Sequence, residues 1–267
     1  MPAKLDQKTN QRPDKKEVLT VIKIISKEIN QFIEPVVSRI AKQKKNPYKV
    51  LISCLLSLRT KDEVTDIATK KLFSKINQPE DLIKLSTKTI EKLIYPVGFY
   101  KRKAVTIKKI SKILIKKYDS KVPNTIEQLL ELKGVGRKTA NIVLGFGFGK
   151  PAMAVDTHCH RIPNRFGWIN TKNPEETEQE LMIIIPKNKW VEFNNMIVAF
   201  GQNICRPVGP KCNQCSITKY CLYYRKVYMN KLNANDTLTI NNKHWGDLID
   251  KKESNYYGCC RKGFSQF

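Results

Sequence analysis

The sequence predicts an all-α protein. Apolar residues recur at helical spacing along most of the chain, whereas the strict alternation of apolar and polar residues that is typical of strands is almost absent. Helix start signals also recur, several of them an Asn or Gln that can cap a helix directly before a proline at its first position. With 267 residues, of which 41% are hydrophobic, the chain can form one large domain or two smaller ones around a real core.

Each helix expected in the first half of the chain has a stripe or a start signal. An apolar stripe predicts a helix over about residues 18–29, and Asn46 with Pro47 opens the next one, which extends to Leu58. Thr60-Lys61-Asp62-Glu63 matches a capping box, in which the side chain of Thr60 would close the first turn of a helix. Further helices are expected from Pro79 to Leu85, over 87–94 and over 101–117.

The second half continues the helical pattern as far as the last cysteines. Thr125 and its neighbours cap a helix that ends near Leu132, and Asn173 before Pro174 caps one that ends before Pro186. A long helix is expected over about residues 189–204. Beyond about residue 226 the sequence is polar and weakly periodic, so residues 226–267 are expected to be a disordered tail.

The charge balance favours a polyanionic partner. Forty-nine Lys and Arg oppose 24 Asp and Glu, a formal net charge of +25, and neutralised phosphates release condensed counterions. Charge alone leaves DNA, RNA and a merely lysine-rich protein open. No apolar run is long enough to span a membrane, and the polar start of the chain matches no secretory signal. We therefore expect a reducing, cytoplasmic location (nucleoid-associated in a prokaryote), where eight cysteines are not a disulfide framework.

A glycine turn joins two expected helices. Lys133-Gly134-Val135-Gly136-Arg137 permits a positive φ and a close approach of the main chain to a ligand. The helix that follows presents free N–H groups to an anion such as a DNA phosphate, so the residues from Lys133 to Arg137 are expected to contact DNA. An ordinary pair of helices with a glycine turn explains the pattern as well.

Two charged residues close to this turn carry candidate chemistry. Lys138 lies in the first turn of a helix, where a cation opposes the helix dipole. It could act as an amine nucleophile or simply bind a phosphate. Asp156 precedes another helix start, so that it could cap that helix, hold an anion beside a developing positive charge, or do both.

Four cysteines predict a metal centre. Cys205, Cys212, Cys215 and Cys221 lie within 17 residues, and soft thiolates at this density select zinc or an iron–sulfur cluster. Their density alone leaves the two equally open, with redox-active thiols as a third alternative. Arg206 and Lys211 lie between the first two of these cysteines, where they could meet phosphates.

The segments Leu132–Asn141 and Val155–His158 together resemble the endonuclease III family of helix-hairpin-helix DNA glycosylases. The similarity extends from about Val18 to Cys221, and the hairpin, lysine, aspartate and cysteines arrive in the family's order. Lys133 departs from the proline that is common in the family, which changes the rigidity of the turn but not the chemistry.

The resemblance implies a bifunctional glycosylase and abasic-site lyase of base excision repair. Lys138 would be the nucleophile and Asp156 the catalytic aspartate. The enzyme would excise damaged bases, expected to be oxidised pyrimidines, and cleave the strand 3′ to the abasic site by β-elimination through a Schiff base. The cysteines would hold one [4Fe-4S] cluster with a structural and DNA-docking role, and the partner would be double-stranded DNA. A monomer is the default expectation for the oligomeric state.

The family architecture implies two helical lobes on either side of a DNA-binding cleft. A six-helix barrel with the helix-hairpin-helix would span residues 40–150, and an iron–sulfur cluster lobe would combine 17–39 with 151–225, after a polar arm at 1–16. Arg59 and Phe99 align with the positions that fill the stack after a nucleotide is flipped out, although the family often has glutamine and leucine there and Phe99 could equally belong to the core.

Two rival functions remain. A related monofunctional glycosylase, such as the type that removes adenine from mismatches, would lack Lys138 and tends to carry a C-terminal recognition domain. A non-catalytic helix-hairpin-helix DNA-binding module would need the basic face and the hairpin, but neither Lys138 nor Asp156.

Overall fold

The computed structural model describes residues 12–32, 36–43 and 46–230, and these residues form helices and turns but no strand. The all-α prediction is confirmed. The N-terminal residues 1–11 of the expected polar arm and residues 231–267 of the expected tail lie outside the described residues. In the described part of the chain, no helix combines the length and the apolar character needed to cross a bilayer.

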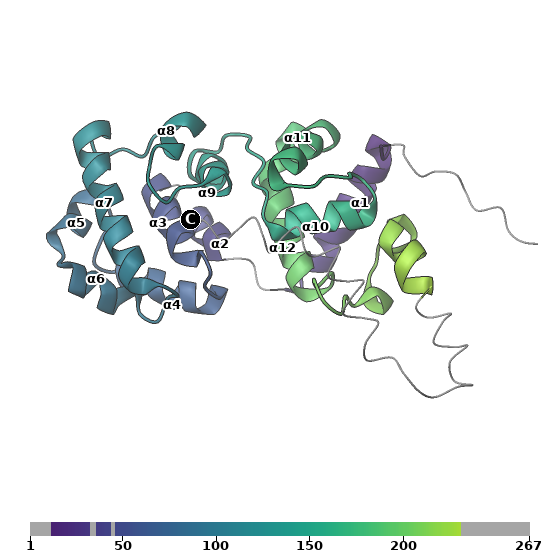
Figure 1. The fold of residues 1–267 in the computed structure, drawn as a ribbon, viewed down its shortest axis with the longest axis horizontal. Helices are drawn as coiled ribbons and strands as arrows, with labels where there is room; N and C mark the ends of the chain where they lie inside the picture. The colour runs from purple at the N-terminus through teal and green to yellow at the C-terminus, as the bar shows by residue number, and fades with distance from the viewer. Residues whose placement is uncertain (1–11, 33–35, 44–45, 231–267) are drawn as a thin grey trace, which may run out of the picture.

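The helices form two groups (Figure 1). The first, here called the barrel lobe, contains eight of the α-helices in the described residues and ends in a π-helical turn: α2 (Val36–Gln43), α3 (Pro47–Ser57), α4 (Asp62–Phe73), α5 (Pro79–Lys84), α6 (Thr87–Ile94), α7 (Tyr100–Tyr118), α8 (Ile126–Leu130), α9 (Arg137–Ile142) and η1 (Val143–Gly147). The second, the cysteine lobe, contains α1 (Lys15–Ile29), α10 (Thr157–Phe166), α11 (Pro174–Ile184) and α12 (Trp190–Asn203), followed by the cysteine-rich segment.

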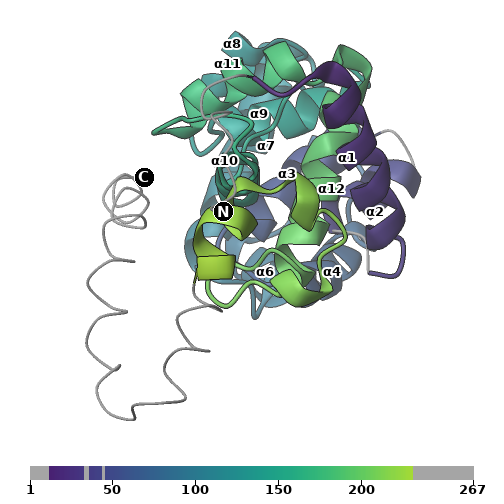
Figure 2. The same ribbon diagram turned by 90° about the vertical axis from the view of Figure 1, so that its right-hand side faces the viewer.

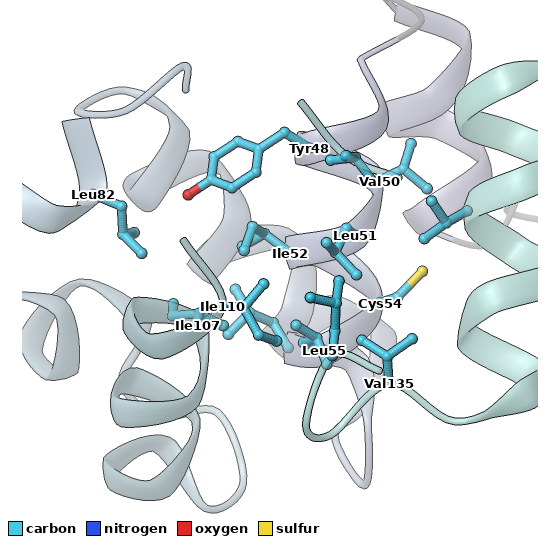
Figure 3. Packing of buried hydrophobic residues seen from close by; sticks show 14 of the residues in the cluster. Tyr48, Val50, Leu51, Ile52, Cys54, Leu55, Leu82, Ile107, Ile110 and Val135 are labelled. Atoms are coloured by element: carbon cyan, nitrogen blue, oxygen red, sulfur yellow. The ribbon is translucent and has the colours of Figure 1, made fainter. Parts of the chain in front are cut away.

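Helix α3 is the centre of the barrel lobe. Its residues from Val50 to Leu56 are all buried, in keeping with an apolar surface on every side of the helix. Helices α2, α4, α7 and α9 pack around it. Figure 3 shows its side chains in one continuous core, with Tyr48 toward one end and Val135 of the glycine turn toward the other. The turn is therefore anchored in the core of the lobe.

The short helix α2 was not anticipated from the sequence. It packs against α3 and α4 of the barrel lobe, and Arg39 forms an ion pair with Asp66 of α4 at 3.4 Å. The expected boundary assigned residues up to 39 to the other lobe. These contacts lead us to place the boundary before Val36.

The cysteine lobe is built on α12. Helix α1 lies alongside α12 (Figure 2) and buries the stripe that the sequence predicted, including Val18, Ile22 and Ile25. Helix α10 crosses α12 so closely that a Cβ on Gly201 would lie 2.3 Å from Nδ1 of His158. This close packing fixes the first turn of α10 against the lobe.

Most of the predicted helix starts are confirmed by their caps. The side chain of Asn46 accepts a hydrogen bond from the N–H of Lys49 at 3.1 Å, and Asn173 accepts one from Glu176 at 2.8 Å. The capping box at Thr60 is wrong, because Lys61 is the N-cap of α4 and makes no side-chain cap. The hydroxyl of Thr60 instead accepts hydrogen bonds from the N–H of Gly98 and from Lys103. Hydrogen-bond donors that are remote in sequence thus take the place of the N–H group in the first turn of α4.

Candidate active site

The glycine turn is exposed at Gly134 and Gly136 and buried at Val135 between them. Gly134 has a φ of +96°, and a Cβ there would lie 3.2 Å from Cγ2 of Thr106 on α7. Val135 is 6% exposed and its N–H donates to the carbonyl of Leu132 at 2.8 Å, so the main chain that can reach a ligand is that of Gly134 and Gly136. A Cβ on Gly136 would meet nothing within 4 Å, which leaves open space beside the N-terminus of α9. Lys133 is exposed next to it.

Lys138 of α9 and Asp156 face each other across the two lobes. The Nζ of Lys138 lies 4.0 Å from Oδ2 of Asp156, and the two side chains are 44% and 10% exposed. Asp156 is the N-cap of α10, as predicted, and its Oδ1 accepts a hydrogen bond from the N–H of Cys159 at 2.8 Å. One carboxylate oxygen therefore fixes the side chain, and the other faces the amine.

Two buried asparagines hold the segment that carries Asp156. Asn141, one helical turn after Lys138, donates from its side chain to the carbonyl of Met153 at 3.0 Å. Asn194 of α12 donates to the carbonyl of Ala154 at 2.8 Å. Because the segment is tied to the helix that carries Lys138 and also to the neighbouring lobe, buried hydrogen bonds set the separation of Lys138 from Asp156. No signal in the sequence marks either asparagine for this role.

Further polar groups surround the amine. Burial raises the pKa of Asp62 at the start of α4, while a hydrogen bond with Gln202 and the charge of Lys138 oppose this rise. Burial lowers the pKa of His158, and Asp156 opposes that effect. Asp62 was interpreted from the sequence as part of a capping box, and a local motif gave no signal that it would lie near Lys138.

Arg137 joins the two lobes. Its Nε and Nη2 donate to the two carboxylate oxygens of Glu178 on α11 at 2.8 and 2.9 Å. The side chain of Glu178 is 8% exposed, so the carboxylate depends on this partner. The guanidinium, which we expected to contact DNA, thus holds α9 against the cysteine lobe next to Lys138.

Arg59 and Phe99 form an exposed pair near the barrel lobe's surface. The guanidinium carbon of Arg59 lies 5.9 Å from the ring centroid of Phe99, whose side chain is 61% exposed. Phe99 is therefore not a core residue. Both have a positive φ, 52° for Arg59 and 56° for Phe99. Residues with side chains seldom adopt this conformation, and it is concentrated at functional sites.

The four clustered cysteines line one cavity, together with apolar side chains of α10 and α12 such as Phe166 and Phe200. No three His, Cys, Asp or Glu side chains in the described ranges converge tightly enough to hold a single metal ion. Ligand sulfurs on a tetrahedral zinc stand only about 3.8 Å apart, whereas an iron–sulfur cluster binds each thiolate through a different iron. Four soft thiols around one cavity are a donor set that suits a thiolate-bound metal centre.

Arg165 of α10 fixes the loop that follows the first of these cysteines. It donates to Sγ of Cys205 at 3.5 Å, to the carbonyl of Arg206 at 2.6 Å and to that of Pro207 at 2.7 Å. Its guanidinium also lies 4.7 Å from the ring centroid of Tyr223. The side chain of Arg206 is exposed on this loop and that of Lys211 is half-buried.

Comparisons with known proteins bear on the fold and on these residues. Residues 52–187 match the model of the HhH-GPD superfamily of base excision DNA repair proteins. Over 200 residues the chain is 46% identical to endonuclease III of Thermotoga maritima, an alignment that covers 74% of this chain and 94% of the relative. The chain belongs to the endonuclease III family.

Solved structures agree with this assignment. The fold superimposes on a trapped covalent endonuclease III–DNA intermediate with a TM-score of 0.70 and 34% identity, covering 80% of this chain and 98% of that one. A non-covalent endonuclease III–DNA complex gives a TM-score of 0.72 at 33% identity, with coverages of 82% and 99%.

The family assignment establishes the class of function. This endonuclease III homologue is a base excision repair DNA glycosylase, and abasic-site lyase activity is typical of its family. The matched segment contains the glycine turn, Lys138 and Asp156 but ends before the four cysteines. The cysteine segment therefore has to be judged on its own geometry and on what is typical of the family.

Proposed function

We propose that Lys138 and Asp156 are the catalytic residues of a bifunctional glycosylase and abasic-site lyase. The observation that carries this proposal is the 4.0 Å separation of the Lys138 amine from Oδ2 of Asp156. Lys138 is half-exposed, so a substrate can reach its amine, while Asp156 is anchored as a helix cap beside it. An accessible amine can attack the sugar, and a fixed carboxylate beside it can stabilise the positive charge that develops there.

The proposed reaction starts from a nucleotide flipped out of the duplex. After its amine has lost a proton to water, Lys138 attacks C1′ of the sugar; the C1′–N bond to the base breaks, and the base leaves with that electron pair and takes up a proton from water. The carboxylate of Asp156 stabilises the positive charge that develops on the sugar. The sugar ring opens to give a Schiff base with Lys138. Loss of a proton from C2′ then expels the 3′ phosphate, and water releases the lysine.

We propose that the glycine turn, together with Lys133, binds a phosphate of double-stranded DNA. Its support is the open space beside Gly136 and the exposed main chain of the turn. Arg206 and Lys211 would contact phosphates from the cysteine lobe. The chain's net charge of +25 favours such a partner, and we propose that a monomer acts in the compartment that holds the DNA, the cytoplasm in a prokaryote.

We also propose that Cys205, Cys212, Cys215 and Cys221 hold a [4Fe-4S] cluster. The support is their common cavity, the charged donor Arg165 beside Cys205, and the occurrence of this cluster in the family. When bound, the cluster would cross-link the segment and hold the loop with Arg206 in place, with no part in the reaction itself. Burial raises the pKa of Cys215 to about 12, so loading would displace a proton from its thiol.

Cluster loading gives a prediction with an internal control. The purified protein should be brown, absorb broadly at about 400 nm and contain about four iron atoms per chain. Cys212→Ser should lose most of this absorbance. Cys54→Ser should keep it, because Cys54 is buried in the core of the other lobe. A colourless protein with stoichiometric zinc would contradict the assignment.

The substrate class we propose is damaged pyrimidines, with oxidised or ring-saturated bases foremost. A panel of duplexes, each with one defined lesion, tests this proposal together with the glycosylase step. We expect base release and strand cleavage on a ring-saturated thymine at rates at least about tenfold above those on uracil, a difference of about 1.4 kcal/mol in activation free energy. Preference for uracil or for opened purine rings would overturn the substrate class.

A further inference from the structure

A buried lysine lies beneath the exposed pair Arg59 and Phe99. Lys103 of α7 is 9% exposed. Its amine donates to the carbonyl of Leu56 at 2.7 Å, to that of Leu58, and to the hydroxyl of Thr60 at 3.0 Å. All three acceptors belong to the end of α3 and the turn that carries Arg59. A lysine is seldom buried unless its amine has hydrogen-bond partners. Because all three partners of this amine lie between residues 56 and 60, the amine fixes the conformation of that stretch of chain.

The same network reaches the turn that carries Phe99. The N–H of Gly98 donates to Oγ1 of Thr60 at 3.2 Å. A Cβ on Gly98 would lie 2.7 Å from the carbonyl oxygen of Arg59, so the two turns touch along their main chains. Lys103 and Thr60 thus join two turns that lie about forty residues apart in the sequence.

Both turns hold a residue in the left-handed region. The φ values are +52° for Arg59 and +56° for Phe99, and neither residue is a glycine. Such conformations persist only where the surrounding structure determines them more strongly than the local preference. The hydrogen bonds of Lys103 and Thr60 provide that constraint, and the result is two exposed side chains held side by side.

We propose that Lys103 is a positioning residue for catalysis: it holds Arg59 and Phe99 in the arrangement that fills the base stack when a nucleotide is flipped out. This proposal rests on the flipping step of the proposed function. The three acceptors need all three N–H groups of an ammonium, because a neutral amine has only two. Burial lowers the pKa of Lys103 to about 8, which leaves the amine mostly protonated at neutral pH.

The test compares one abasic strand in two forms. In a duplex, Arg59 and Phe99, here called the wedge, must fill the gap in the base stack as the abasic sugar enters the site. In the single strand there is no base stack to fill. Lys103→Met keeps the length and burial of the side chain but removes its hydrogen bonds. We expect its duplex cleavage rate to fall by about tenfold to a hundredfold, as misplacement by about 1 Å can cost, while its single-strand rate stays within about twofold.

A matched control lies on the same helix. The amine of Lys108 also donates to a carbonyl, that of Leu85, but at a distance from both turns. Lys108→Met should leave the ratio of duplex to single-strand rates unchanged. If Lys103→Met lowers both rates equally, or changes neither, the proposal is overturned.

Two further variants test the link between the two turns without changing Lys103. In Thr60→Val, Lys103 stays in place but the link to Gly98 is lost, so the ratio should fall in the same direction even if Lys103→Met does not fold. Combining Thr60→Val with Phe99→Ala should add little to the effect of Phe99→Ala alone, because both act on one wedge. Additive losses, or an unchanged ratio in Thr60→Val, would overturn the proposal. Failure of the wild-type protein to cleave either form would instead refute the proposed lyase function.

Discussion

Replacing Lys138 by glutamine is expected to abolish strand cleavage at abasic sites while the protein remains folded and still binds DNA. Glutamine has no nucleophilic amine, so it can neither attack C1′ nor form a Schiff base. Loss of the nucleophile should lower the cleavage rate by at least about 10⁴-fold, the scale seen when a covalent catalyst is removed. Single-turnover cleavage of an abasic duplex measures this loss, and a filter or mobility assay measures binding.

The fold should tolerate this substitution because the Lys138 side chain is 44% exposed and lies outside both hydrophobic cores. Lys150→Gln is the matched control. It removes the same charge from an exposed lysine shortly after the same helix, one that donates to the carbonyl of Asn124. It should cleave at close to the wild-type rate. Cleavage by Lys138→Gln within about tenfold of wild type would show that another group is the nucleophile.

Asp156→Asn is expected to lower the rate of base excision by about 10²- to 10³-fold with little change in stability. The substitution separates the two tasks of the carboxylate. Asparagine caps a helix about as well as aspartate, so the hydrogen bond from Cys159 should survive. The negative charge that faces Lys138 is lost, and with it the stabilisation of the developing positive charge on the sugar. Single-turnover excision and thermal unfolding measure the two effects separately.

Another cap in the same lobe provides the control for Asp156. Asn173 accepts a hydrogen bond from the N–H of Glu176 at 2.8 Å at the start of α11. Asn173→Ala should cost about 1 kcal/mol of stability, and thus about 2–4 °C in Tm, without slowing excision. If Asp156→Asn excised bases at the wild-type rate, Asp156 would be a helix cap and nothing more.

Local signals in the sequence were sufficient for most helices and drew attention to Lys138 and Asp156, whose catalytic roles were implied only by the resemblance to the family. The caps Asn46, Asn173 and Asp156 each bond to an N–H three residues ahead, so the pattern and its partner lie in one short window. The glycine turn is equally local. The order of turn, lysine, aspartate and cysteines was specific enough to indicate the family.

Contacts between remote segments could not be predicted in this way. Thr60 matched a capping box, yet its hydroxyl meets Gly98 and Lys103, 38 and 43 residues away. Arg137 looked available for a phosphate, but it pairs with Glu178, 41 residues further along the chain. A one-dimensional pattern shows which groups need a partner, but the packing of the lobes decides which partner they find.

The cysteine segment could be predicted only in part. The spacing of its four cysteines indicated a metal centre, but thiol density alone did not separate zinc from an iron–sulfur cluster. The fold adds that the four side chains line one cavity, beside a charged donor from α10. Arg165 is 40 residues from Cys205 and could not have been associated with it from the sequence alone.

Trapping the reaction with borohydride tests the central claim most directly. Borohydride reduces a Schiff base to a stable amine, so the wild-type protein incubated with an abasic or lesion-containing duplex should form a covalent adduct. Digestion and mass spectrometry should then locate the sugar remnant on Lys138, and Lys138→Gln should give no adduct. Base release without any adduct, or an adduct on Lys133 or another amine, would contradict the assignment of Lys138 as the nucleophile.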